Sequence, residues 1–74
     1  MSDREDEAKD KIIQLLKKER REMFTKEIAQ TLKMALPTAS KYLGILHAEG
    51  KVIKSDKRKP YIIWLLKEVG KQNN

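Results

Sequence analysis

Residues 24–50 read FTKEIAQTLKMALPTASKYLGILHAEG, and this stretch decides the predicted fold. Its apolar residues recur at three- and four-residue spacings in two groups, which places each group on one face of a helix. The segment 33–36 between them leaves room only for a tight turn, and Pro37 suits the first turn of the second helix. We therefore expect a helix-turn-helix. The two apolar groups are Ile28, Ala29 and Leu32, and Ala39, Leu43 and Leu46.

The second of these helices, expected over residues 37–49, has an unusual outer face. Gly44 lies in the middle of that face, where glycine costs roughly 1 kcal/mol relative to alanine. Close approach to a grooved partner would explain the glycine, and the DNA major groove admits a helix that carries short polar and basic side chains. Tolerated drift at Gly44 is the alternative. A helical projection gives the outer face as Pro37, Lys41, Gly44 and Ala48, flanked by Thr38, Ser40 and Ile45, with Tyr42 half-turned towards the core.

The composition bounds the class of protein. The 74 residues suffice for a single domain over 1–74 and leave no room for an enzyme domain. Cysteine is absent and His47 is the only histidine, so we expect no metal site and no other cofactor. No catalytic constellation or glycine-rich phosphate loop is present. Because the chain has no membrane-length apolar run and an acidic start, we expect a cytoplasmic protein.

Charge is distributed unevenly along the chain. Residues 1–10 hold five acids and two bases, a net charge of −3, whereas the whole chain carries +6, which leaves +9 on the remaining residues. A basic body of this kind is typical of proteins that bind nucleic acid, although other proteins also have basic surfaces. The acidic start needs no partner, because acids stabilise the first turns of a helix.

The N-terminal segment predicts a first amphipathic helix from Ser2 or Asp3 to about Arg20. Its apolar residues fall on one face, which would pack on the later pair of helices. Ile13 lies off that stripe, and we expect it to face solvent in a monomer. The stripe consists of Ala8, Ile12, Leu15 and Leu16.

Residues 21–24 are too short for anything but a turn or a two- to three-residue strand, with Phe24 expected in the core. Thr25 then resembles an N-cap, because its hydroxyl can accept from the free N–H groups ahead of it. We expect the second helix over about 26–32. A reciprocal capping box would need a glutamate or glutamine three residues after Thr25, and position 28 is isoleucine, so we expect none.

After Gly50, which is expected to close the third helix in a left-handed conformation, two strand-like runs follow. Residues 52–55 and 61–66 are rich in β-branched and aromatic residues and flank a basic tip at 56–60, which predicts a β-hairpin. Alternation would bury Ile62, Trp64 and Leu66. Residues 67–74 are polar and are expected to fray.

Three helices followed by a two-stranded hairpin with a basic tip make an α+β chain, mainly α, that resembles the winged helix-turn-helix fold. The sequence is similar in detail to the DNA-binding core of MarR- and ArsR-type transcriptional regulators of bacteria and archaea. The similarity lies in TKEIAQTL at 25–32, LPTASKYLGIL at 36–46 and EGKVI at 49–53.

This resemblance implies double-stranded DNA as the partner and assigns roles to the matching positions. The third helix would face DNA bases or phosphates, the hairpin tip would form the wing, and the start of the second helix would contact the DNA backbone. The implied residues are Pro37, Thr38, Ser40, Lys41 and Tyr42 on the helix, Lys57, Arg58 and Lys59 on the wing, and Thr25 and Lys26 at the start of the second helix.

The chain also departs from those regulators. Ala35 stands where a serine or threonine often opens the third helix, the cysteines of ArsR-type metal sensors are absent, and the chain lacks the length for the additional helices of MarR-type proteins. The resemblance therefore implies a minimal module, of archaeal type, without an obvious sensor.

Three functions remain open from the sequence: a sequence-specific regulator, an architectural protein that coats DNA without specificity, and a winged-helix module that binds another protein. We also expect a homodimer, because strand alternation leaves apolar side chains on the face away from the core. Those side chains are Tyr61, Ile63 and Leu65, together with Ile53 and Ile13.

Overall fold

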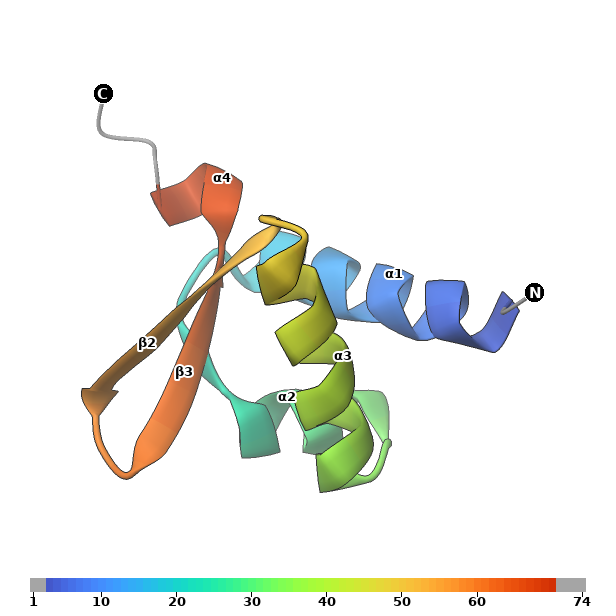
Figure 1. Cartoon of the computed structure of the whole chain (residues 1–74), viewed down its shortest axis with the longest axis horizontal. Helices are drawn as coiled ribbons and strands as arrows, with labels where there is room; N and C mark the ends of the chain where they lie inside the picture. The colour runs from blue at the N-terminus through green and yellow to red at the C-terminus, as the bar shows by residue number, and fades with distance from the viewer. Residues whose placement is uncertain (1–2, 71–74) are drawn as a thin grey trace.

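In the computed structural model, which describes residues 3–70, three helices precede an antiparallel hairpin (Figure 1). This arrangement confirms the predicted α+β winged-helix architecture. The elements are α1 (Asp3–Glu19), β1 (Met23–Phe24), α2 (Thr25–Leu32), α3 (Leu36–Ala48), β2 (Val52–Arg58), β3 (Tyr61–Leu66) and α4 (Lys67–Gly70).

α1 packs on the later elements through the predicted stripe. It ends one residue before the predicted Arg20, which adopts a left-handed φ of 50°. The proposed cap Ser2 lies outside the described residues. Ile13 does not face solvent as predicted: it is half-buried against the core, because the 50–51 turn and Leu66 approach α1 on that side. The buried residues of α1 are Ile12, Leu15 and Leu16.

α2 begins one residue earlier than predicted, so that Phe24 and not Thr25 occupies the cap position. The backbone N–H of Phe24 donates to a carboxylate oxygen of Glu27 at 3.4 Å, which satisfies one N–H group at the helix start. Lys33 closes α2 with a left-handed φ of 58°, and its N–H donates to the carbonyl oxygen of Gln30 at 3.2 Å. A tight turn therefore leads into α3, as predicted.

α3 runs from Leu36 to Ala48, one residue before the predicted limits at both ends. Ala35 provides no side-chain cap, and Gly50 adopts the predicted left-handed conformation with a φ of 79°. The side chains of the predicted inner stripe are buried, which fixes which face of α3 is turned outwards. That stripe consists of Ala39, Leu43 and Leu46.

β3 is the central strand of a three-stranded antiparallel sheet with the order β1-β3-β2. Its partners are set by Met23 opposite Trp64 on one side and Val52 opposite Leu66 on the other. β2 continues through a bulge to Arg58, which lies opposite Tyr61, so the strand is longer than the predicted 52–55. The predicted five-residue tip is therefore a two-residue turn at 59–60.

The two faces of β3 differ in part from the prediction. Trp64 and Leu66 are buried as predicted, but Ile63, expected to face away from the core, is only 2% exposed. Ile63 and its neighbour Trp64 point to opposite faces and are both buried, so both faces of β3 are covered at this point, where Phe24 and Ser55 lie opposite Ile63. Ile63 therefore contributes little to an exposed apolar surface.

The prediction that Phe24 lies in the core is wrong. Met23 is 2% exposed and lies in the core, whereas Phe24, the residue predicted there, is 38% exposed.

After β3, the short helix α4 replaces the expected frayed segment at 67–70, and the N–H of Lys67 donates to the carbonyl oxygen of Lys51 at 3.1 Å. Residues 71–74 lie outside the described part. Among the residues described, no helix is long and apolar enough to cross a membrane.

Candidate nucleic-acid interface

The outward face of α3 carries the residues predicted to contact DNA. Pro37, Ser40 and Lys41 are exposed, and Thr38 and Tyr42 are half-buried at its flanks. The ammonium group of Lys41 lies 5.6 Å from the centre of the Tyr42 ring, within the range of a cation–π contact. The structure thus places Pro37, Ser40 and Lys41 on the outward face of α3, with Thr38 and Tyr42 on one flank of it, and Lys41 carries the single positive charge of the five.

Gly44 lies in the middle of the same face. A Cβ atom added at this position would meet no heavy atom within 4 Å, so nothing inside the protein requires glycine there. Its backbone is helical and needs no glycine either, since among the glycines described only Gly50 has a positive φ. The cost of glycine in the helix interior therefore has no intramolecular compensation.

The three bases of the hairpin tip are not equivalent. The Nζ atom of Lys57 lies 2.9 Å from an oxygen of the Glu22 carboxylate, which neutralises its charge locally. Arg58 and Lys59 are exposed and have no ion pair within the part of the chain that the structure describes. The pair also joins two segments on either side of β3, because Glu22 directly precedes β1 and Lys57 belongs to β2. Sequence spacing gave no sign of this difference.

The two residues predicted at the start of α2 also differ. Thr25 is half-buried, and its hydroxyl oxygen accepts a hydrogen bond from the indole N–H of Trp64 at 2.7 Å. The same hydroxyl lies 3.5 Å from the carbonyl oxygen of Ile62 and donates to it. The Thr25 hydroxyl is therefore engaged in fixing α2 to β3, whereas Lys26 is exposed beside it.

A shallow groove between α2, α3 and the hairpin tip was not anticipated from the sequence. It has a volume of about 310 Å³. Leu36, which lines it, is 50% exposed. Sequence spacing gave no sign of this exposure, because Leu36 lies three residues before Ala39 and seven before Leu43 and so continues the buried stripe of α3. The groove is lined by Phe24, Thr25, Lys26, Leu36, Ser40, Pro60, Tyr61 and Ile62.

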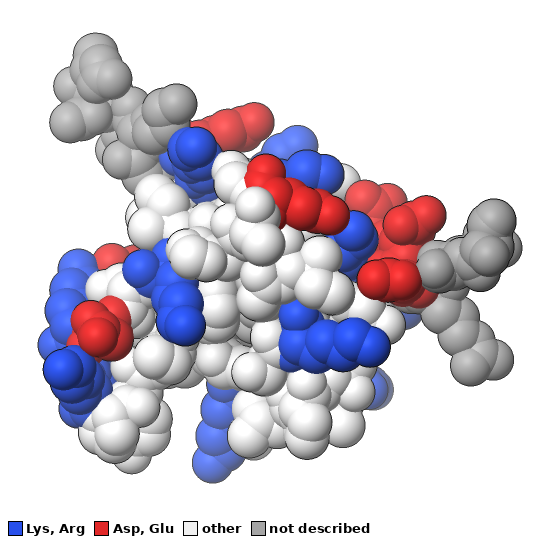
Figure 2. Space-filling model, viewed as in Figure 1, with Lys and Arg blue, Asp and Glu red and all other residues white. Residues whose placement is uncertain are grey.

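Charge is separated across the molecule. On the face that Figure 2 shows, bases gather over the hairpin at the lower left with acids among them, and further acids lie along the upper edge and on the right, over the N-terminal end of α1. Lys41 and Lys26 add to the basic side without a described ion pair of their own. A polyanion would therefore be attracted to the hairpin more than to the N-terminal half of α1.

Two ion pairs fasten the ends of the helices. A hydrogen bond from Arg21 lowers the pKa of the Glu27 carboxyl below its ordinary value of 4.5; desolvation opposes this shift, and a hydrogen bond from the Phe24 backbone adds to it. A hydrogen bond from Lys9 lowers the pKa of the Glu49 carboxyl in the same way, at an Nζ to oxygen distance of 3.1 Å. Both carboxylates are thus charged over the neutral range and hold α1 and its following loop to the helix pair.

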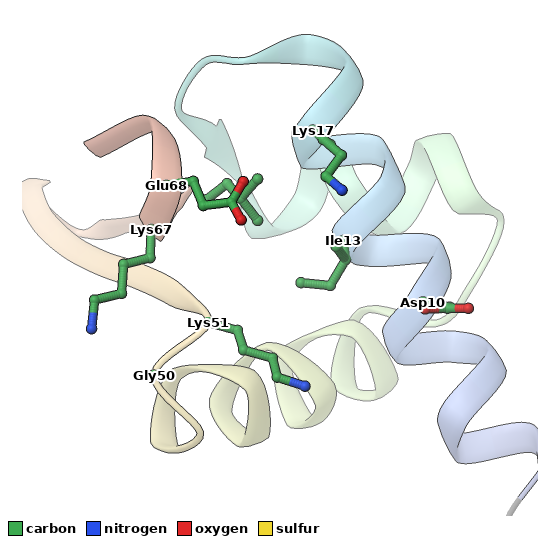
Figure 3. Close-up of a pocket in the computed structure, with 8 residues that line it drawn as sticks. Asp10, Ile13, Lys17, Gly50, Lys51, Lys67 and Glu68 are labelled. Carbon is green, nitrogen blue, oxygen red and sulfur yellow. The ribbon is translucent and has the colours of Figure 1, made fainter. Parts of the chain in front are cut away.

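A second hollow, of about 510 Å³, lies between α1, the 50–51 turn and α4. Figure 3 shows Ile13 near its middle, with Lys17 above it, Lys51 below it and Lys67 pointing away. Its charged residues are exposed and of both signs, so it has no defined electrostatic preference. Among residues 3–70 no group of three histidine, aspartate or glutamate side chains is placed to hold a metal ion.

The helix pair, the hairpin wing and the exposed basic face define a winged-helix protein. Residues 8–68 match the model of the family described as FaeA-like protein, which is most of the chain. The chain therefore belongs to the FaeA-like family, a family of winged-helix transcriptional regulators and not of enzymes. No curated protein and no solved structure matches the chain.

Proposed function

We propose that this chain is a transcriptional regulator that binds double-stranded DNA sequence-specifically, with α3 in the major groove and the hairpin against the backbone or minor groove. Membership of the FaeA-like family supports a regulatory role. The similarity of residues 25–53 to MarR- and ArsR-type regulators supports the same docking mode. The whole described chain would then act as one DNA-binding module.

The observation that carries the proposal is the outward face of α3. It combines a glycine that the fold does not need with short polar side chains and one unpaired lysine. A major groove is about 12 Å wide and admits a helix, and small outer side chains let the helix backbone approach the base edges closely. An ordinary solvated helix face carries long charged side chains instead.

In this arrangement Ser40 and Lys41 contact base edges, since both are exposed near the N-terminal end of α3. Pro37, Thr38 and Tyr42 surround them and contact sugars and phosphates. Contacts to phosphate add affinity without sequence preference. The backbone contacts come from Arg58 and Lys59, from Lys57 once it leaves Glu22, and from Lys26, with Thr25 holding the start of α2 in place.

Two other functions compete with this one. An architectural protein that coats DNA would use the same basic side, and a protein-binding module would use the small face of α3 for another chain. Selection of preferred sites from random duplexes, followed by titration of the preferred and a random duplex at several salt concentrations, separates the three. We expect the preferred site to bind about 10³-fold more tightly, or better. Equal affinity would indicate an architectural protein, and no salt-dependent binding would indicate a protein-binding module.

We further propose a homodimer in the cytoplasm, acting without a cofactor. The burial of Ile63 leaves Ile53, Tyr61 and Leu65 as the apolar groups available on the outer face of the sheet. Ile53→Glu is expected to shift the molecular mass measured by light scattering from dimer to monomer at high micromolar concentration. A parent protein that is already monomeric there would refute the dimer and leave the DNA-binding proposal intact.

A further inference from the structure

Leu36 is the one large apolar side chain of α3 that is exposed among the residues described. It occupies the first position of α3, directly before Pro37. It lies one helical turn before Ser40, so the two side chains project from the same side of the helix, and both line the groove beside the hairpin tip. Leu36 therefore lies among residues proposed to contact base edges, although it has no donor or acceptor of its own.

The surroundings of Leu36 are apolar at the centre and basic at the edges. Across the groove, the rings of Phe24 and Tyr61 are 5.7 Å apart and meet edge to face. Lys26 lines the same groove, and Lys41 adjoins Ser40 in the sequence. An apolar partner that also carries dense negative charge would match this combination.

We propose that Leu36 contacts the C5-methyl group of a thymine in the major groove and so favours thymine at that position of the bound site. The major-groove edges of the base pairs present donors and acceptors, and the thymine methyl group is their distinctive apolar feature. A leucine placed among base-contacting residues discriminates only through that feature. The inference rests on the proposed function, because it requires α3 to lie in the major groove.

The geometry also locates the thymine. Leu36 and Ser40 are separated by one helical turn, about 5.4 Å along the axis, and successive base pairs are about 3.4 Å apart. The thymine should therefore lie within two base pairs of the base that Ser40 contacts. Its methyl group would contact the Leu36 side chain at the protein surface and would not reach the protein core.

The test replaces each thymine of the selected site, one at a time, with deoxyuridine, which removes only the methyl group. We expect one position at which the affinity of the parent protein falls about fourfold, as for a single buried methyl group worth about 0.8 kcal/mol. Leu36→Ala should bind the thymine and deoxyuridine duplexes with equal affinity at that position. Gln14→Ala is the control, since Gln14 is exposed on α1 and lines no part of this groove, and it should discriminate like the parent.

The outcomes separate this inference from the proposed function. Discrimination that is absent in the parent, or that persists unchanged in Leu36→Ala, overturns the inference while leaving specific DNA binding in place. A preferred site without a thymine overturns it too. Failure of the parent to prefer any duplex overturns the proposed function itself. Because Leu36 is half exposed, its replacement should leave the melting temperature near that of the parent, and a thermal melt verifies this before the titrations.

Discussion

Lys57 on the hairpin and Glu22 before β1 form an ion pair at 2.9 Å across the sheet, so one of the three tip bases is partly neutralised within the protein. We therefore expect Arg58 and Lys59 to contribute more to DNA binding than Lys57. Removal of one contact to a phosphate should flatten the slope of log K against log salt by about 0.9. Replacing both Arg58 and Lys59 with alanine should flatten the slope by about twice this amount, and Lys57→Ala should flatten it by less than this amount.

The same titrations contain a converse control. Glu22→Gln removes the carboxylate charge and releases Lys57, so it should make the salt dependence steeper. If Lys57→Ala flattens the slope as much as the joint replacement of Arg58 and Lys59, the ion pair does not persist in the complex, and the ranking of the tip bases fails.

The Thr25 hydroxyl and the Trp64 indole tie α2 to β3, and this hydrogen bond should matter for stability. Thr25→Val keeps the shape of the side chain but leaves the indole N–H unpaired in a site where Trp64 is buried. An unsatisfied buried donor costs about 1–3 kcal/mol. Urea unfolding, followed by the fluorescence of the single tryptophan, measures the decrease in stability. Thr25→Ser keeps the hydroxyl and should retain most of the stability; equal decreases in both variants would show that packing of the methyl group, and not the hydrogen bond, dominates.

The helix pair was predictable from the sequence because its apolar spacing is dense enough to define one face. Ala39, Leu43 and Leu46 lie one turn apart, and all three are buried. The two-residue strand β1 offers no such repeat, so whether Met23 or Phe24 faces the core depends on pairing with β3, a contact between residues about 40 positions apart. Ile63 was misplaced because strand alternation assumes one covered face, whereas the adjacent Ile63 and Trp64 are both buried.

The residues of the candidate site could be predicted from the sequence, but the ion-pair and hydrogen-bond partners of their side chains could not. Exposure of Ser40 and Lys41 follows from the helical period. The partners of Lys57 and Thr25 come from distant parts of the chain, and side-chain partners of that kind leave no periodic signal. Leu36 continues the apolar repeat of Ala39 and Leu43, so spacing could not predict that it is exposed beside the groove.

Gly44 should separate the stability of the protein from its affinity for DNA. Gly44→Ala adds a methyl group into open space, so the free energy of unfolding should rise by about 1 kcal/mol. If α3 approaches the groove closely, affinity for the preferred duplex should nonetheless fall. Gly50→Ala is the contrasting variant, because the φ of 79° at Gly50 makes alanine strained there and should lower stability. A Gly44→Ala variant that gains stability and keeps full affinity would remove the argument for close approach.

Acid should destabilise the protein through Glu27 and Glu49. Their pKa values lie below the ordinary 4.5 because of hydrogen bonds from Arg21 and Lys9, so the folded state binds fewer protons than the unfolded state as acid is added. Their contribution is present above about pH 4.5 and is lost as the pH falls through the folded pKa.

Urea midpoints measured at pH 7 and pH 3 test this dependence. A variant with Glu27→Gln and Glu49→Gln should show a smaller drop than the parent. Asp56→Asn is the control, because no ion pair of Asp56 is present among the residues described, and it should follow the parent. Parallel pH curves for the parent and the double variant would contradict the assignment.

The outward face of α3 should carry specificity and not only affinity. If Ser40 and Lys41 contact base edges, replacing either with alanine should weaken binding to the preferred duplex more than to a random duplex, since a good base contact discriminates by about 1–3 kcal/mol. Replacement of Arg58 and Lys59 should instead weaken both duplexes alike and preserve their affinity ratio. Lys11→Ala, on the exposed side of α1, removes the same charge as Lys41→Ala and should leave the ratio unchanged. Competition titrations at constant salt measure the ratio of the two affinities directly. Equal weakening of both duplexes by the α3 variants would show that another part of the protein recognises the sequence.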